Sequence, residues 1–251
     1  GGGVAGAGTI DGSTISGNQA TKTSCCGGGG GVFVDSGTTI ITRSTITGNV
    51  ADGGGGVFAG FASGSALVAI LESTVAGNAL TGASTLPSPG RELLIGSITT
   101  GLEMTITTSV MGEPAAPGAP TACGSTTSFL PASGNNNVVS DHSCLVLPGP
   151  YDVLDADARL GPLADNGGVP LAVGPSATPV AVETRLPSPL SPARDHIGAW
   201  YDRCTGTDER GVARPQGPAC DSGAVEAKLG RFTAQAPERV LDTRDGTGGV
   251  S

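Results

Sequence analysis

A six-residue motif recurs through the first half of the chain at nearly constant intervals. The motif Ser13-Thr14-Ile15-Ser16-Gly17-Asn18 returns with starts at Ser44 and Ser73, and a degenerate copy starts at Thr108, which gives intervals of 31, 29 and 35 residues. Repeats of about 20–50 residues are typical of solenoids, in which each unit buries its apolar face against its neighbours. The repeat therefore constrains the fold before any other property of the sequence is considered.

Two further strand-like pieces keep step with the motif. One comes with the Gly-rich runs, at 1–5, 27–34 and 53–59. The other precedes the later copies of the motif, at 38–41, 66–70 and 104–107. Each unit therefore reads as strand, turn, strand, strand, turn, which is one coil of a β-solenoid. Gly, Thr and Ser dominate these segments and disfavour helices, which excludes a helical solenoid. We predict an all-β fold, a right-handed single-stranded parallel β-helix.

The apolar position of the motif predicts an aliphatic column. Side chains alternate along a strand, so Ile15, Ile46, Val75 and Val110 are expected at the same place on successive coils. Stacked coils lie about 4.8 Å apart, the ordinary spacing of paired strands. Like residues then contact like residues, and the column forms a dry core.

The Gly-Asn pair that ends each full copy predicts a ladder of amides. Gly reaches positive φ without strain, so the pair suits a sharp corner between strands. Asn18, Asn49 and Asn78 would then stack, and their side-chain amides would hydrogen-bond between coils.

Composition agrees with such a fold and limits the partners. Gly contributes 43 of 251 residues, while one Trp, two Tyr and five Phe are few for a compact globule of this size. Thin layers of small and β-branched side chains need fewer large aromatics. The net charge of −9 and the presence of only two Lys argue against nucleic-acid binding, which needs clustered basic residues.

Six cysteines are present, and no two are spaced as Cys-x-x-Cys, which argues against a structural zinc or a thioredoxin-like site. An even number without a redox motif suits disulfides in an oxidising compartment. We expect Cys204 to pair with Cys220, and Cys123 with Cys144. The adjacent pair at 25–26 stays open between free thiols, a bridge to another part of a longer chain and a rare vicinal disulfide.

Several motifs resemble the choice-of-anchor Q domain proteins, which are bacterial surface proteins similar in style to polymorphic outer membrane protein repeats. The Gly-Gly-Gly-Val and Ser-Thr-Ile-Ser-Gly-Asn unit is one part of the likeness, and the later parts lie at 160–168, 191–198, 208–215 and 219–226. Arg194-Asp195-His196 departs from the family pattern. The resemblance implies a pectate-lyase-like architecture, export and display at the cell surface, and it implies no known reaction.

The organisation expected from these features has three parts. Residues 1–112 form the regular coils, 113–229 form degenerate coils and a closing region with two disulfides, and 230–251 form a linker and the start of a further extracellular module. The abrupt ends lead us to expect a fragment of a longer chain.

Two residue groups invite a metal or catalytic interpretation but lack the required context. Asp152, Asp155 and Asp157 form an acidic cluster without a calcium-binding loop motif, and we interpret it as a solvated turn. His142 and His196 each follow an Asp, but no nucleophile elbow accompanies them. We expect no catalytic, cofactor-binding or metal-binding residues.

Two Gly-rich segments also have competing interpretations. Gly1, Gly3 and Gly6 match Gly-x-Gly-x-x-Gly, but no strand precedes them, which disfavours dinucleotide binding. The uncharged stretch from Gly53 to Leu71 approaches the length of a membrane span, but the repeat explains it better.

The function expected from the sequence is a non-catalytic secreted or cell-surface module, structural or adhesive, that displays loops such as 80–95 from a rigid rod. We expect a monomer whose partners are surface glycans or cell-surface proteins. The alternative is a polysaccharide lyase or glycosidase, since some β-helices are such enzymes. The acids of the repeats, Asp11, Asp35, Asp52 and Glu72, fall at different phases of the coil. Acids and an Arg that converge in one groove would favour the enzyme.

Overall fold

The computed structural model of the chain describes residues 3–20, 28–60, 66–81, 89–96, 102–127, 131–145, 147–168 and 181–228. Within these ranges the regular structure consists of β-strands and one short 3₁₀-helix, η1 (His142–Cys144). Four sheets contain only parallel strands, and one further pair of strands is antiparallel. The prediction of an all-β fold with stacked parallel strands is confirmed.

The parallel sheets arise from successive passes of the chain, each of which we call a coil. Sheet A contains β1 (Val4–Ala5), β5 (Val32–Val34), β9 (Val57–Ala59), β13 (Leu93–Ile95) and β16 (Cys123–Ser125). Sheet B contains β2 (Gly8–Asp11), β6 (Gly37–Thr42), β10 (Ala66–Leu71), β14 (Leu102–Thr107) and β17 (Ala132–Ser133). Sheet C contains β3 (Thr14–Ser16), β7 (Thr45–Thr47), β11 (Thr74–Val75), β15 (Val110–Met111) and β18 (Val138–Val139). Sheet D contains β4 (Gln19–Ala20), β8 (Val50–Ala51) and β12 (Ala79–Leu80).

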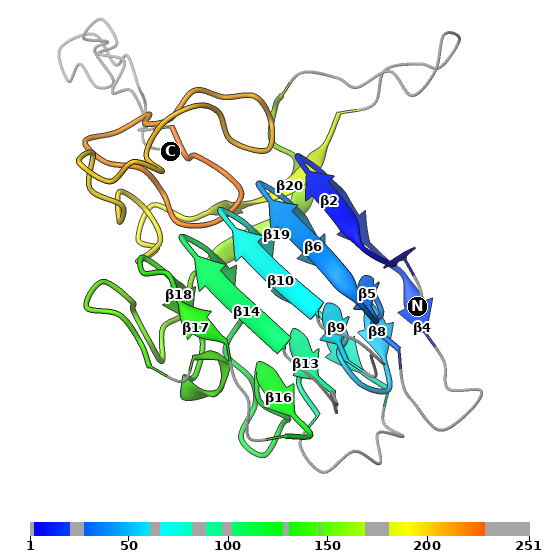
Figure 1. Cartoon of the computed structure of the whole chain (residues 1–251). Helices are drawn as coiled ribbons and strands as arrows, with labels where there is room; N and C mark the ends of the chain where they lie inside the picture. The colour runs from blue at the N-terminus through cyan, green and yellow to red at the C-terminus, as the bar shows by residue number, and fades with distance from the viewer. Residues whose placement is uncertain are drawn as a thin grey trace, which may run out of the picture.

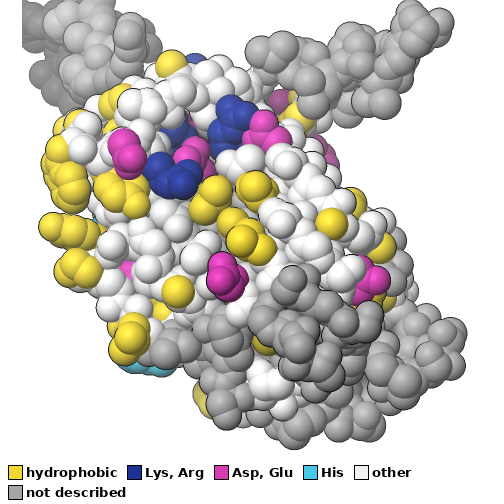
Figure 2. Space-filling model, in the orientation of Figure 1, with side chains coloured by type: hydrophobic (Ala, Val, Ile, Leu, Met, Phe, Trp, Pro, Cys, Tyr) yellow, Lys and Arg dark blue, Asp and Glu magenta, His cyan; other side chains and the backbone are white. Residues whose placement is uncertain are grey.

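Each coil adds one strand to sheets A, B and C, beside the strand of the coil before it (Figure 1). Stacking of this kind is compatible with the predicted parallel β-helix. Sheet B forms one broad face, on which exposed hydrophobic side chains are scattered among polar ones (Figure 2).

The aliphatic column lies inside the stack, on sheet C. The strand register pairs Ile15 with Ile46 and Ile46 with Val75, and all three side chains are buried. They belong to one core cluster with the inward-facing residues of sheets A and B. Burying these apolar side chains is the main favourable contribution to folding.

The fourth copy of the motif is displaced by one residue from the predicted alignment. Val75 pairs with Met111, and Val110 pairs with the preceding threonine. The prediction for Val110 is therefore wrong. The shift arises because Ser109, and not Thr108, takes the place that Ser73 has in the coil before it. The Ser73 N–H donates to the Ser109 hydroxyl at 3.1 Å.

The asparagines form a continuous ladder at the corner after sheet C. The Oδ1 atom of Asn49 accepts from the N–H and the Nδ2 of Asn18 at 3.0 and 2.9 Å, and Asn78 accepts from Asn49 in the same way. The glycines that precede the three asparagines have φ of 67°, 65° and 74°, which side chains other than glycine rarely adopt.

The ladder ends on Glu92, a residue that the motif did not predict. Its carboxylate accepts from the Gly77 N–H at 3.1 Å and from the N–H and Nδ2 of Asn78 at 3.1 and 2.7 Å. Glu92 is completely buried, and burial raises its pKa to about 7. The donors from Asn78 and the charge of Arg91 act in the opposite direction and favour the carboxylate.

A second ladder follows the turn between sheets B and C. Each backbone N–H donates to the side chain of the next coil at 2.9–3.2 Å, in the order Ser13, Ser44, Ser73, Ser109, Asn137 and Asp152. This ladder also ends on a carboxylate. The two ladders satisfy buried backbone donors that the short strands leave without partners.

The last part of the described chain packs on the threonines of sheet C. In Figure 1 its yellow and orange loops lie beyond the carboxyl ends of the strands of sheet B. It includes β19 (Leu160–Asp165) and β20 (Glu183–Pro187), which form the antiparallel pair. The Ala224 N–H donates to the Thr74 hydroxyl at 3.1 Å, and Val110 packs in a small apolar cluster with Ala158 and Ala193. We call residues 158–168 and 181–228 the closing segment, because the residues directly before them still continue the stack through the pairing of Val153 with Val138.

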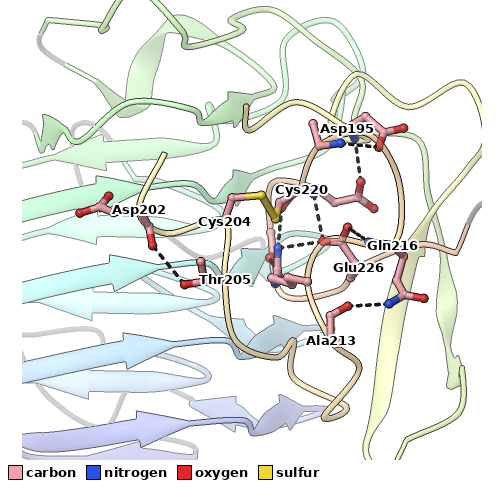
Figure 3. Close-up of a disulfide and its surroundings, with 12 residues drawn as sticks. Asp195, Asp202, Cys204, Thr205, Ala213, Gln216, Cys220 and Glu226 are labelled. Carbon is pink, nitrogen blue, oxygen red and sulfur yellow. Dashed lines mark hydrogen bonds and ion pairs between the residues drawn. A yellow bond between two sulfur atoms is a disulfide. The ribbon is translucent and has the colours of Figure 1, made fainter. Parts of the chain in front are cut away.

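Two disulfides lie in this half of the molecule. Cys123 of β16 is bonded to Cys144 of η1, and Cys204 is bonded to Cys220 within the closing segment. The second bridge lies beside Glu226 and its hydrogen-bond donors (Figure 3). Disulfides are typical of proteins in oxidising compartments. Cys25 and Cys26 lie outside the described residues, as do 230–251.

Removal of the Cys204–Cys220 bridge is expected to destabilise the closing segment. The bridge spans 16 residues, and a loop of that size stabilises a fold by about 3 kcal/mol in the chain-entropy account. The double variant C204S/C220S should unfold at lower urea concentration than the parent protein under oxidising conditions. With reductant present the two proteins should converge, and a variant as stable as the oxidised parent would contradict this role.

Among the described residues, no helix has the length and apolar character needed to cross a bilayer. The uncharged stretch from Gly53 to Leu71 instead contains β9 and β10, and residues 61–65 within it lie outside the described part.

Candidate functional site

The charged residues of the closing segment converge on a buried network. Asp208 lies at its centre and accepts hydrogen bonds from Arg210 and from the Val212 and Glu226 N–H groups, at 2.7–3.1 Å. The guanidinium of Arg210 also donates to the carbonyls of Asn166 and Glu226, at 2.7 and 2.6 Å. Every oxygen of the Asp208 carboxylate therefore already has donors from the protein itself.

A second buried pair lies next to it. Arg214 and Glu226 are both fully buried at the side chain, with 3.3 Å between Nη1 and Oε2. Arg214 also donates to the carbonyls of Asp221 and Gly223, both at 2.6 Å. Glu226 accepts from the Gln216 N–H at 3.0 Å, as Figure 3 shows. The pair thus ties three parts of the closing segment together.

Glu209 points the other way, toward the threonines on the outer face of sheet C. Its Oε2 accepts from the Thr45 hydroxyl at 2.5 Å, and its Oε1 lies 3.0 Å from the Thr14 hydroxyl. The Thr14 hydroxyl also lies 2.5 Å from the Glu183 carbonyl. A hydroxyl has one proton, so if Thr14 donates it to Glu183, a protonated Glu209 completes the chain by donating to Thr14. Burial raises the pKa of Glu209 to about 8, in agreement with that arrangement.

A cavity of about 300 Å³ opens between the coils and the closing segment. Its lining includes Asp11 at the end of β2 and Arg43 directly after β6, together with Asp208, Glu209 and Arg210. Arg43 and Asp11 form a bidentate ion pair at 2.9 and 2.5 Å, and each is about one-third exposed or more. The cavity therefore brings acids and arginines together, although they are far apart in sequence.

The chemistry available to the cavity is limited by these contacts. Glycoside hydrolysis needs two carboxyl groups that are free to act on one bond. The Asp208 carboxylate is enclosed by its donors, and both oxygens of Glu209 contact threonine hydroxyls. Of the carboxylates that line this cavity, Asp11 is the one with substantial exposure. Paired with Arg43, it suits hydrogen bonding to a hydroxylated ligand better than proton transfer between two carboxyl groups.

The raised pKa of Glu209 predicts a pH-dependent stability. Glu209 ionises near pH 4.5 in the unfolded chain but near pH 8 in the folded one, so its contribution to stability falls as pH rises through that window. The variant E209Q keeps both hydrogen bonds without a proton to lose. We expect it to gain stability relative to the parent between about pH 5 and about pH 9.

Thermal unfolding of E209Q and of the parent protein at about pH 5 and at about pH 9 measures this gain in stability. Glu103, exposed on β14, provides the control, because E103Q removes a charge outside the buried network. If the difference in melting temperature between E209Q and the parent is the same at both pH values, Glu209 is ionised in the folded protein over the whole of this pH range.

The histidines and the Asp cluster lie in structural contacts. His142 pairs with Asp155 at 2.8 Å on the surface, and His196 contacts the Ser222 hydroxyl at 2.8 Å, not its neighbour Asp195. Burial lowers the pKa of His196. Asp152 caps the serine ladder. Among the described residues, no group of three or more potential ligands is placed to hold a metal ion.

Sequence reasoning missed one surface feature. Aromatic residues are scarce, but Tyr151, Trp200 and Tyr201 lie together, with ring centroids 5.6 and 6.0 Å apart. The adjacent Trp-Tyr pair was the available signal, while the approach of Tyr151 depends on the fold.

Comparisons with protein-family models, with curated proteins and with solved structures found no match to this chain. Its function is therefore inferred from the geometry of its own residues.

Proposed function

We propose that the chain is a right-handed parallel β-helix of the choice-of-anchor Q type. Two features support the proposal. Successive coils contribute strands to the same three sheets in the same order. The family-like motifs also contact one another, because Arg210 donates to the Asn166 carbonyl at 2.7 Å and the Asp195 N–H donates to Asp221 at 2.7 Å. The motifs are then the parts of a closing unit that seals one face of the coils.

Its function, we propose, is that of a non-catalytic secreted or cell-surface module with a structural or adhesive role. The observation that carries the proposal is the engagement of the buried charges. Glu92 contacts groups within the coils, and Asp208, Arg210, Arg214 and Glu226 contact groups within the closing segment, so these charges stabilise the two parts from inside. The two disulfides suit an oxidising environment outside the cytosol.

Two measurements test this role. Protease treatment of intact source cells should remove the protein, because a surface module is accessible from outside. Incubation of the purified chain with polyuronates and neutral polysaccharides should release no reducing ends and no unsaturated products. Protein that is protected in intact cells would overturn the assignment to the surface.

The second candidate is a carbohydrate-active enzyme, favoured by the acids and arginines that line one cavity. Product release that disappears in D11N and persists in the exposed control variant E103Q would establish this alternative. We expect neither variant to differ from the parent, because neither carboxylate takes part in a reaction.

A further inference from the structure

The single Trp of the chain and both of its Tyr residues occupy one place on the surface. Tyr151 and Trp200 meet edge to face at 63°, and Trp200 and Tyr201 meet at 87°. Tyr151 and Trp200 are 49 residues apart in the sequence, so the cluster exists only because of the fold. We call these three residues the aromatic platform.

The platform exposes a large apolar area. Trp200 is 69% and Tyr151 is 49% exposed. Burying large aromatic rings is favourable, so exposed aromatics in contact with one another are typical of binding surfaces. The space-filling view also shows hydrophobic side chains along the edge formed by the closing segment (Figure 2).

The fold holds Trp200 and Tyr201 in place before any ligand arrives. The Tyr201 hydroxyl donates to the Gly134 carbonyl at 2.9 Å, and the Tyr201 N–H donates to the Gly198 carbonyl at 2.9 Å. The Trp200 ring lies so close to Gly198 that a Cβ there would be 2.3 Å from Nε1. The Cys204–Cys220 disulfide comes shortly after Tyr201 in the sequence. Rings fixed in this way lose little conformational entropy on binding.

The charge around the platform narrows the choice of ligand. Segments 151–157 and 200–202 contain four Asp and neither Lys nor Arg, and the whole chain has a net charge of −9. Arg203, which follows, is paired with Glu72 at 3.5 Å. Polyuronates, sulfated glycans and nucleic acids would be repelled. A protein partner of ordinary affinity would need about 800 Å² of surface, much more than three rings provide.

We propose that the aromatic platform binds a neutral glycan. The apolar C–H face of a pyranose ring stacks on the exposed indole and phenol rings, and its hydroxyls donate to nearby carboxylates such as Asp202. The proposal deepens the adhesive role proposed above and rests on it.

The test uses the whole chain and a panel of soluble neutral polysaccharides, namely a β-glucan, a dextran, a galactomannan and a xylan, with polygalacturonate as the acidic comparison. Trp200 is the only tryptophan, so a bound sugar should change the fluorescence of the parent protein directly. Gel mobility in each polysaccharide then compares the variants. At least one neutral member should retard the parent, and polygalacturonate should not.

We expect W200A and Y151A to bind at least about tenfold more weakly, with W200F intermediate. L67A is the matched control, since Leu67 is a 39% exposed side chain on β10 of sheet B. Unchanged melting temperatures show that the exposed substitutions leave the fold intact. No retardation by any neutral member, or equal retardation of W200A and the parent, overturns the proposal. The surface role fails separately, by protection from protease in intact cells.

Discussion

Replacement of Arg214 by methionine is expected to lower the free energy of unfolding by about 3–5 kcal/mol. Arg214 and Glu226 are both fully buried, so the variant leaves a carboxylate in the interior without its cation. It also leaves the carbonyls of Asp221 and Gly223 without donors. Each of these losses costs free energy because water cannot replace the missing partner.

Urea unfolding followed by circular dichroism measures the effect. Arg43 offers the matched control, because its ion pair with Asp11 is partly exposed at 32% and 41%, and its hydrogen bond to the Thr207 hydroxyl is only partly buried. R43M should cost less than about 1 kcal/mol, as exposed ion pairs do. Similar losses for R214M and R43M would mean that the buried network contributes no more than a surface contact.

Replacement of Asn49 by alanine should cost about 2–4 kcal/mol through the ladder that it interrupts. Asn49 accepts two hydrogen bonds from Asn18, and its Nδ2 donates to the Ile15 carbonyl at 2.9 Å. The side chain is completely buried, so alanine leaves donors and an acceptor without partners on both sides of the coil.

The first member of the ladder provides the comparison. Asn18 is only partly buried, and N18A leaves the Asn49–Asn78 link intact. We expect a loss of less than about 1 kcal/mol for N18A, measured by the same unfolding transition. If N49A and N18A are equally stable, the amide ladder does not hold the coils together.

The coils were predictable because their signal is periodic. Ile15, Ile46 and Val75 recur at 31 and 29 residues, and the structure pairs them in register. The next interval is longer, and there the alignment failed by one residue at Val110. A single-residue shift moves side chains to the other face, so Met111 joins the inner core while Val110 packs against the closing segment.

The closing segment could not be predicted in the same way, because it has no period. Glu209 contacts Thr14 across 195 residues, and nothing in the local sequence of either residue indicates the contact. Glu92 was missed for a related reason. It stands 14 residues after Asn78 rather than one repeat later, so it continues the ladder from a different part of the coil.

The two ladders also give the stack a direction. In each one, N–H donors point toward the later coil, and the final acceptors are the carboxylates of Glu92 and Asp152, whose own backbone N–H groups donate to the carbonyls of Ala122 and Gly149 instead. Consider a duplicated unit of about 30 residues inserted before Glu92. Its asparagine would accept from the amide of the earlier coil and donate to the acceptor of the later one. In the same unit inserted after Glu92, the first asparagine would turn its Oδ1 toward a carboxylate that offers no donor. Duplication of a repeat is therefore expected to extend each ladder only on the earlier side of the carboxylate that ends it.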